Sequence, residues 1–565
     1  MTTKPATRPL LQTGAQILVD SLITHGANVG FGVPGESYLA VLDAMLDRED
    51  DFRFIICRQE GGVTNMADAY GKLTGQPGLA FVTRGPGATN ASVGVHTAYQ
   101  DSTPLILFIG QIHSRYAERE SFQEVDYRRM FGPMAKWVAS IDHADRVQEM
   151  VSHAYHIATS GRPGPVVLAL PEDMQDEEAE VKKVARYQRV AAHPGDADMH
   201  RLRDLLSKAK KPLVILGQAG WSRKGCEDFL AFATAYDLPV ACSYRAQDMI
   251  DNRDRHYVGD VAVGLNPALA KRISESDLLI AVGSRLGEWS TVNYTMFDIP
   301  RPKQPFVHIY PGAEELGRVY QADLLINAGM PEFAAAARKL PPLKPAWSEW
   351  TKAARADLEA WQKPVKVPGT VNMSEIVNWL NKRLPPESIV TNGAGNFSLW
   401  VHRFYRYGGF RTQLGPTSGA MGYGVPAGVA AKLVYPKKMV LAFAGDGDFL
   451  MTGQELATAA QYDARVIFIV VNNGMYGTIR MHQERHYPER VSGTMLKNPD
   501  FAALARAYGL HGETVEATAD FEAAFERAAA AKTAALIEVR VDPDAISPRT
   551  TLSAIRAEAK KSKKT

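Results

Sequence analysis

The sequence predicts an α/β protein with three doubly wound parallel-sheet domains. Its 565 residues provide for about three domains of roughly 150–200 residues each. Short apolar runs alternate along the chain with stretches of helical pattern, which is typical of parallel sheets covered by helices. Hydrophobic residues make up 45% of the chain and charged residues 22%, the ordinary balance of a globular protein.

The first predicted domain covers residues 1–190. Residues 13–25 and 63–74 have the pattern of helices. The charged segment 176–189 predicts a linker to the next domain. Short apolar runs predict strands at 28–31, 54–57, 79–83, 105–110 and 166–170.

The second and third predicted domains cover residues 191–365 and 366–565. A proline-rich stretch at 340–345 and the segment 363–369 flank the boundary between them. Similar first and third domains would fit an ancient duplication. Apolar runs predict strands at 212–217, 278–283 and 305–309 in the second domain, and at 388–391, 439–444, 466–471 and 535–541 in the third, which also has a predicted helix at 452–462.

Charge and cysteine content narrow the classes of function and location. The net charge is +2, so no strong field indicates a nucleic acid or a membrane as partner. Cys57, Cys226 and Cys242 are far apart and lack metal-ligand spacing, which suits a reducing compartment. Residues 1–11 contain no apolar core of a signal peptide, and no run of about 18 apolar residues occurs. We therefore expect a cytoplasmic protein.

The most informative motif is Gly445-Asp446-Gly447, followed by Asn472-Asn473. A Gly-Asp-Gly triplet alone is usually an ordinary turn. Here, however, each polar group directly follows a predicted buried strand. The glycines permit a tight turn against a ligand, and Asp446 supplies a hard oxygen for a hard cation. Because ligands in open α/β sheets bind at the carboxyl ends of strands, the two groups predict one site for a magnesium diphosphate.

Further motifs lie beside other predicted strands. Glu60, in the segment 57–62, lies at a strand-to-helix junction, where a carboxylate alone is most simply a first-turn residue favoured by the helix dipole. The glycine-rich segment 83–90 either lets the backbone approach a flat ring closely or is a tight loop without a ligand, and a second glycine-rich segment covers 415–424. In the segment 392–397, backbone N–H groups would be able to cradle phosphate oxygens at a helix start.

Together these motifs resemble those of thiamine diphosphate-dependent enzymes, and the resemblance extends over most of the chain. It is strongest to the acetolactate synthase-like group, whose glycine-rich first loop matches residues 31–35 and whose active-site segment matches residues 122–124. For the metal, the resemblance implies Mg²⁺ bound by the side chains of Asp446 and Asn473 and by the carbonyl of Met475. Such oxygen ligands suit Mg²⁺.

The resemblance also implies how thiamine diphosphate is held. The Glu60 carboxylate would lie beside N1′ of the aminopyrimidine and promote removal of the proton from thiazolium C2. The Gly419 carbonyl would accept a hydrogen bond from the 4′-amino group, and Met421 would bend the cofactor so that this amino group meets C2. The other implied cofactor-binding residues are Pro34, Gly35, Pro86, Asn90, Gly393, Ala394, Gly395, Asn396, Gly445, Asp446, Gly447, Asp448, Asn473, Met475, Tyr476 and Gly477.

The chain departs from the acetolactate synthase pattern near the implied substrate pocket. Glu36 stands where that group has Gly, Arg84 where it has Ser, and His482 where it has Trp. Either the Glu36 and His482 side chains point to solvent, or they reshape and polarise the pocket for another substrate, whereas the sequence assigns no effect to Arg84. In the second case, His482, His113 and Gln123 are the candidates for proton handling on the substrate, since histidine titrates near neutrality.

The region that binds FAD in flavin-containing relatives matches residues 283–287. This segment lacks the acidic pair and the threonine-glycine pattern that follow it in those relatives. We therefore expect thiamine diphosphate and Mg²⁺ as cofactors, with the pattern arguing against FAD.

The activity implied is that of a carbon–carbon bond lyase or ligase acting on a 2-keto acid. The alternatives are a decarboxylase or hydrolase of the same family, acting on an aryl 2-keto acid, an acyl-CoA or a dione, and a non-catalytic regulatory protein that keeps the fold. Retention of Glu60, Asp446 and Asn473 argues against the last of these. Because the family's cofactor spans two subunits, we expect a homodimer or homotetramer that binds a small-molecule substrate and neither nucleic acid nor membrane.

Overall fold

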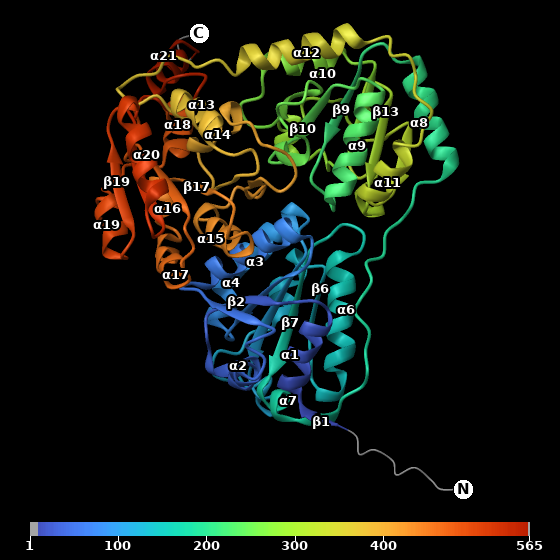
Figure 1. Cartoon of the computed structure of the whole chain (residues 1–565), viewed down its shortest axis with the longest axis vertical. Coiled ribbons are helices and arrows are strands. Elements are labelled where there is room, and N and C mark those ends of the chain that lie inside the picture. Colours follow the sequence, from blue (N-terminus) through green and yellow to red (C-terminus); the bar gives the residue numbers. More distant parts are fainter. Residues whose placement is uncertain (1–9, 563–565) are drawn as a thin grey trace. The chain divides into compact units, whose positions relative to one another are not determined.

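The structure, a computed structural model, describes residues 10–562. Residues 1–9, on which the expectation about a signal peptide largely rests, lie outside this part. Three six-stranded parallel sheets, each flanked by helices, organise the chain (Figure 1). The predicted α/β class with three doubly wound domains is thereby confirmed. The chain divides into two compact units, Met1–Val190 with one sheet and Ala191–Thr565 with two, called unit 1 and unit 2 below. A domain boundary near residue 365, within unit 2, stays a prediction.

Unit 1 is built on a sheet with the strand order β3-β2-β4-β5-β7-β6. Its strands are β2 (Val29–Gly32), β3 (Arg53–Ile56), β4 (Gly78–Val82), β5 (Leu105–Gln111), β6 (Trp137–Ser140) and β7 (Pro165–Pro171). Its helices are α1 (Gly14–Thr24), α2 (Leu39–Leu46), α3 (Glu60–Thr74), α4 (Pro86–Asp101), α5 (Tyr127–Phe131), α6 (Val147–Thr159) and α7 (Glu172–Asp176). A separate antiparallel pair joins β1 (Leu11–Thr13) to β8 (Glu178–Glu180).

Local capping corrects two predicted helix starts in unit 1. The helix predicted at 13–25 begins one residue later, because the Thr13 side chain caps it and forms a capping box with Gln16. The helix predicted at 63–74 begins at Glu60, because the side chain of Gln59 accepts the Gly62 amide as its N-cap. The predicted linker 176–189 contains the short strand β8, which pairs with the start of the described chain.

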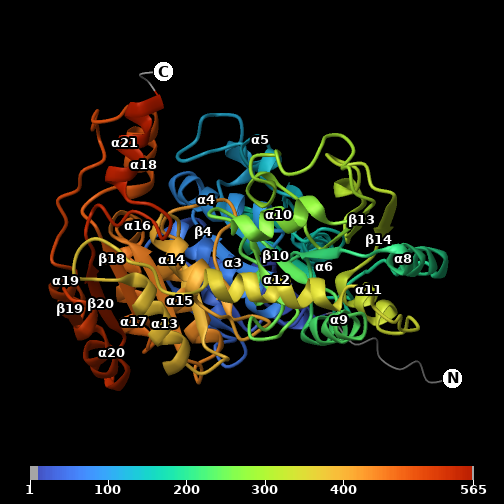
Figure 2. The same cartoon turned by 90° about the horizontal axis from the view of Figure 1, so that it is seen from above.

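The first sheet of unit 2 has the strand order β11-β10-β9-β12-β13-β14, the 3-2-1-4-5-6 order of many doubly wound folds. Its strands are β9 (Pro212–Leu216), β10 (Val240–Ser243), β11 (Tyr257–Val261), β12 (Leu278–Val282), β13 (Phe306–Tyr310) and β14 (Leu324–Asn327). Its helices are α8 (Asp196–Lys208), α9 (Arg223–Ala235), α10 (Pro267–Glu275), α11 (Met330–Ala337) and α12 (Ser348–Trp361). Helix α12, seen lengthwise in Figure 2, packs against α10 and β11.

The second sheet of unit 2 has the order β16-β15-β17-β18-β20-β19. Renumbered within each sheet, this is the order 2-1-3-4-6-5 that unit 1 also has. The strands are β15 (Ile389–Asn392), β16 (Gln413–Leu414), β17 (Val440–Gly445), β18 (Ile467–Asn472), β19 (His511–Val515) and β20 (Ala535–Arg540). The helices are α13 (Met373–Arg383), α14 (Phe397–Phe404), α15 (Gly424–Val434), α16 (Asp446–Phe449), α17 (Leu456–Gln461), α18 (Gly477–His486), α19 (Phe501–Ala507), α20 (Phe521–Ala530) and α21 (Leu552–Ser562).

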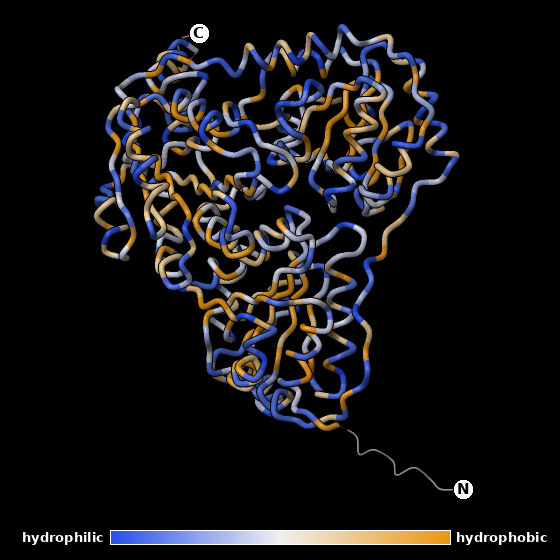
Figure 3. Tube along the Cα trace, viewed as in Figure 1, coloured by the Kyte–Doolittle hydropathy of each residue, from blue (hydrophilic) through white to orange (hydrophobic). Residues whose placement is uncertain are grey.

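The hydrophobic cores lie between the sheets and their helices. Along the chain trace, hydrophobic residues follow the strands, whereas polar residues dominate loops and the outer sides of helices (Figure 3). The predicted helix 452–462 is shorter than expected: a 3₁₀ turn at Gly453–Glu455 leads into α17. Within residues 10–562, no helix combines the length and apolarity needed to cross a bilayer.

Candidate functional site

The polar motifs of unit 2 meet at the carboxyl edge of its second sheet. Strand order reverses between β15 and β17, because β16 lies on one side of β15 and β17 on the other. Loops that leave two such strands diverge and open a crevice. The loop 393–396 follows β15, Asp446 follows β17, and Asn473 follows β18, the neighbour of β17.

A cavity of about 240 Å³ occupies this crevice. The three predicted metal ligands, Asp446, Asn473 and Met475, all line it. Gly419 and Met421 reach it from the loop before α15. The remaining lining residues are Ala394, Gly395, Asn396, Phe397, Trp400, Gly445, Gly447, Asp448, Val471, Tyr476, Gly477, Thr478, Ile479, Val541, Ala545 and Ile546. All the cofactor-binding residues predicted in unit 2 thus line the cavity except Gly393, the first residue of the loop 393–396.

Asp448 ties together two loops around the cavity. Its Oδ1 accepts hydrogen bonds from the amides of Ala394 at 3.1 Å and Gly422 at 2.8 Å. Burial raises the pKa of this carboxyl to about 7, because the charged form loses its hydration. Gly393 packs so closely that a Cβ there would lie 2.5 Å from the carboxyl carbon of Asp448. The loop 393–396 and Asp448 therefore form one tightly fitted cradle.

Asp446 presents a carboxylate in a setting that suits a cation. Its Oδ2 accepts a hydrogen bond from Asn498 Nδ2 at 2.7 Å, and Asn498 Oδ1 is buried without a partner among the described residues. Burial raises the pKa of the Asp446 carboxyl, although Asn498 and the amides of Gly447 and Gly474 oppose this. A bound cation would favour the charged form. The Asp446 carboxylate, the Asn473 amide oxygen and the Met475 carbonyl make an all-oxygen donor set, which fits Mg²⁺.

In unit 1, Glu60 is the first residue of α3 and is half-buried. Its Oε2 accepts a hydrogen bond from Asn90 Nδ2 at 3.0 Å, so two predicted cofactor residues from different helices are in direct contact. A Cβ on Gly87 would lie 3.5 Å from Oε1. Burial, with the Glu60 charge as the next cause, raises the pKa of the neighbouring Tyr38 phenol. The carboxylate therefore stays close to the loop that begins α4.

The loops carrying the other predicted residues of unit 1 also pack together. Gly35 lies so close to the strand end after β4 that a Cβ there would approach the Thr83 Cβ to 2.5 Å. Gly85 has φ +52°, a conformation that L-residues rarely adopt, and Pro86 opens α4 at its first position. The segment around Pro34 and Gly35 and the segment around Pro86 follow β2 and β4, between which the strand order of this sheet reverses.

The candidates for proton handling lie in three different settings. Gln123 contacts the Gly85 loop, where a Cβ on Gly85 would lie 2.8 Å from the Gln123 carbonyl oxygen. The His113 Nδ1 lies 3.6 Å from Asp173 Oδ2. His482, on α18, is mostly exposed and does not line the cavity; partial desolvation of its ring, with the charges of Arg485 and His486, lowers its pKa. A role for His482 at the cavity therefore stays a prediction without a contact to support it.

In the first sheet of unit 2, the segment 283–287 follows β12 at the point of strand reversal. Arg285 donates from Nε to the buried Glu315 at 3.2 Å, and the His308 ring contacts the Ser284 carbonyl at 2.9 Å. Polar groups of this segment thus form hydrogen bonds with other residues of the protein. They leave the expectation about FAD untested.

Known proteins match the chain along most of its length. Residues 12–130 match the N-terminal TPP (thiamine pyrophosphate) binding domain of thiamine pyrophosphate enzymes, residues 199–337 their central domain, and residues 393–539 their C-terminal TPP binding domain. The chain belongs to the thiamine pyrophosphate enzyme family. The predicted resemblance is thereby confirmed, as is the prediction of an enzyme that uses thiamine diphosphate, the same compound as thiamine pyrophosphate.

Several acetolactate synthases are similar to this family member over nearly their full length. The large subunit from Parasynechococcus marenigrum is 32% identical, over 90% of this chain and 84% of that protein. The large subunit from Lactococcus lactis is 30% identical, over 88% of this chain and 87% of that protein. The isozyme 2 large subunit from Escherichia coli is 28% identical, over 94% and 95% respectively.

Three residues that the sequence did not single out also shape the candidate site. Asn498 contacts Asp446, and Glu172 pairs with Arg84. Arg245, from the loop after β10, donates to the Gly393 carbonyl at 2.9 Å and so supports the cradle from behind. Each reaches its partner across 52 or more residues of chain, and no local pattern in the sequence indicates such contacts.

Proposed function

We propose that this protein uses thiamine diphosphate and Mg²⁺ to form a carbon–carbon bond from a 2-keto acid, as an acetolactate synthase-like enzyme. The observation that carries the proposal is the cavity of unit 2, which gathers the predicted oxygen ligands Asp446, Asn473 and Met475 beside Gly419 and Met421. The similarity to acetolactate synthases of three organisms supports the choice of reaction and substrate class.

The residues around the cavity would hold the diphosphate end of the cofactor through its metal. Asp446 would supply one negatively charged ligand, and the amide oxygen of Asn473 and the carbonyl oxygen of Met475 would add neutral ligands. Phosphate oxygens of the cofactor would supply the other negative charge around Mg²⁺. Asp448 holds the loop 393–396 in place by accepting a hydrogen bond from the Ala394 amide. Apolar residues that also line the cavity, among them Trp400 and Ile546, would limit the access of water.

When bound, thiamine diphosphate supplies the nucleophilic carbon and the electron sink for cleavage beside a carbonyl. Glu60 would hold a proton at the aminopyrimidine, and Asn90 would orient the Glu60 carboxylate through their 3.0 Å hydrogen bond. Met421 would impose the bent conformation of the cofactor. Gln123, beside the Gly85 loop, is the substrate-side candidate for which contacts in unit 1 offer support.

We further propose a cytoplasmic homodimer or homotetramer with the cofactor shared between subunits, as the family resemblance implies. The large-subunit names of the relatives also raise a separate regulatory subunit as a partner to test. Size-exclusion chromatography with light scattering would report the mass of the assembly. A monomer at micromolar concentration with cofactor present would contradict this part of the proposal.

Product analysis tests the proposed reaction. The enzyme is incubated with thiamine diphosphate, Mg²⁺ and ¹³C-labelled pyruvate, and in parallel with a panel of other 2-keto acids, and the products are identified by mass spectrometry. Pyruvate should give labelled acetolactate, or another 2-keto acid of the panel should give its condensation product. Release of the aldehyde alone would instead support a decarboxylase. The departures at Glu36 and His482 predict a donor or acceptor other than two molecules of pyruvate, so other 2-keto acids are tested as well. No product from any 2-keto acid would contradict the proposal.

A further inference from the structure

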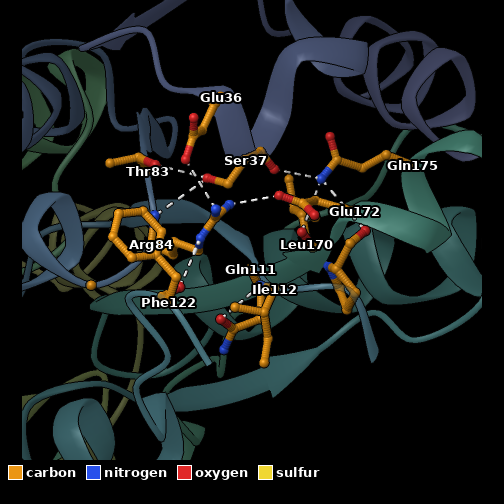
Figure 4. Close-up of polar contacts among 12 residues, drawn as sticks. Glu36, Ser37, Thr83, Arg84, Gln111, Ile112, Phe122, Leu170, Glu172 and Gln175 are labelled. Carbon is orange, nitrogen blue, oxygen red and sulfur yellow. Dashed lines mark hydrogen bonds and ion pairs between the residues drawn. The ribbon is translucent and has the colours of Figure 1, made fainter. Parts of the chain in front are cut away.

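Two of the residues that depart from the acetolactate synthase pattern are in direct contact. The Arg84 guanidinium donates from Nη2 to Glu36 Oε1 at 3.0 Å and from Nη1 to Glu172 Oε1 at 2.6 Å (Figure 4). The three residues follow β2, β4 and β7, at the carboxyl edge of the unit 1 sheet. Only 10% of the Arg84 side chain is exposed, compared with 63% for Glu36 and 40% for Glu172. Two carboxylates at the surface thus orient one buried guanidinium.

The guanidinium also holds a third partner. Arg84 Nε donates to the main-chain carbonyl of Phe122 at 3.2 Å, and the guanidinium carbon lies 5.8 Å from the centre of the Phe122 ring (Figure 4). Hydrogen bonds from an ionised donor are roughly twice as strong as neutral ones. Because the two Nη groups of Arg84 donate to Glu36 and Glu172, the guanidinium plane has little freedom to turn away from Phe122.

The residue next to Phe122 has an unusual backbone. Gln123 has φ +64°, in the left-handed region that non-glycine residues seldom occupy. Such a conformation persists only where surrounding contacts enforce it. Here Arg84 holds the carbonyl just before Gln123, and the Gly85 amide donates at 3.0 Å to the hydroxyl of Tyr127, four residues after Gln123. The segment 122–127 is therefore attached to the Gly85 loop at two points that flank Gln123.

We propose that Arg84 is a positioning residue that presents Gln123 to the substrate on the Glu60 side of the site. Few residues separate Gln123 from Glu60: Gln123 packs on Gly85, and Gly87, two residues after Gly85, is the glycine that approaches the Glu60 carboxylate. A serine at 84 and a glycine at 36 cannot make these contacts, because neither has a guanidinium or a carboxylate. The two departures thus form one device, the Glu36–Arg84–Glu172 clamp. This inference rests on the proposed function.

Substitution of Arg84 tests the clamp by two readouts. Arg84→Met keeps an unbranched apolar stem but removes the guanidinium with its donors, so amide hydrogen exchange in the segment 121–127 should become faster by about ten- to a hundred-fold, as expected for loss of a charged hydrogen bond. The kcat for the 2-keto acid should fall by about ten-fold or more, with the Kd of thiamine diphosphate unchanged. Arg84→Lys, which keeps the charge, should restore part of both.

The matched control is Arg129→Met, since Arg129 lies on α5, two residues beyond the segment 121–127, and its side chain is 91% exposed. It should leave exchange and kcat as they are. Unchanged exchange at 121–127 in Arg84→Met would overturn the proposal, and so would faster exchange throughout unit 1, which would indicate a merely structural arginine. Failure of the proposed function can be told apart from failure of the clamp. In that case the unsubstituted enzyme would give no product, while the exchange experiment would still report on the clamp.

Discussion

Replacement of Gly393 by alanine offers a steric test of the cradle under the candidate cofactor cavity. The added Cβ would lie 2.5 Å from the carboxyl carbon of Asp448 and closer still to both carboxylate oxygens, whereas ordinary contacts begin at 3.4 Å, so one side has to move by more than about 0.9 Å, the difference of the two distances. Asp448 is 3% exposed and accepts the amides of Ala394 and Gly422. Movement of the carboxylate away from the added Cβ would therefore break these hydrogen bonds.

The cost follows from these contacts. Overpacking of a buried site costs about 1–3 kcal/mol, and each hydrogen bond that Asp448 gives up adds about 0.5–1.5 kcal/mol. We expect Gly393→Ala to lower the free energy of unfolding of unit 2 by roughly 2–4 kcal/mol. The loop amides would also leave their positions, and a loss of about 1.4 kcal/mol in binding raises the Kd of thiamine diphosphate ten-fold.

Isothermal titration calorimetry with thiamine diphosphate and Mg²⁺, together with thermal unfolding, measures both effects. The matched control is Gly287→Ala, because a Cβ there would meet nothing within 4 Å and its φ of −73° suits alanine. In an Asp448→Ala background, Gly393→Ala should cost much less, since the colliding group is gone. A Kd and a melting temperature equal to those of the unsubstituted protein would refute the steric argument.

Three further predictions concern the metal and two buried titratable groups. Asp446→Ala should abolish the Mg²⁺ dependence of thiamine diphosphate binding, as followed by calorimetry with and without Mg²⁺; the exposed Asp520→Ala should not, and retained dependence would remove Asp446 from the ligand set. Burial, with smaller effects of two nearby cations, lowers the pKa of His25 to about 4. Because the unfolded chain then binds more protons than the folded one, the stability of unit 1 should fall by up to about 3 kcal/mol as pH drops from 6.5 to 4. A flat urea-unfolding profile over that range, or the same slope in His25→Gln, would contradict this. Glu484 is fully buried, and although burial opposes it, hydrogen bonds led by Arg556 hold its pKa at about 2. Its stabilisation is present above pH 4.5 and lost toward pH 2, so Glu484→Gln should cost about 3 kcal/mol at pH 7 and little at pH 2; an equal cost at both would contradict the assignment.

The sequence predicted the interior strands except β10 and missed the edge strands except β3. Strands such as β17 and β18 are continuous apolar runs, because both faces of a parallel sheet are covered. The edge strand β19, at His511–Val515, is mostly half-buried and polar, so no apolar run indicated it. At β14, buried and exposed residues alternate, which likewise hides the strand. Edge strands need less apolar sequence because only part of their surface is covered.

At the candidate site, contacts that depend on neighbouring strand ends could be predicted, and contacts between distant side chains could not. Asp446 and Asn473 were expected together because each directly follows a strand of one parallel sheet. The pairing of Glu36 with Arg84 joins residues 48 positions apart. Their identities indicated only that the pocket differs from that of the relatives. The side-chain directions that make them one clamp follow from the packing of the loops after β2 and β4.

The exchange of the C2 proton of bound thiamine diphosphate tests the central claim most directly. The claim is that Glu60, held by Asn90, activates a cofactor bound through Asp446 and Asn473. Hydrogen–deuterium exchange followed by NMR after acid quench should be much faster in the enzyme than in the free cofactor. In Glu60→Gln it should fall to the rate of the free cofactor while thiamine diphosphate remains bound, whereas the exposed Glu49→Gln should exchange as the unsubstituted enzyme does. Fast exchange that survives in Glu60→Gln, or exchange in the enzyme no faster than in solution, would contradict the account.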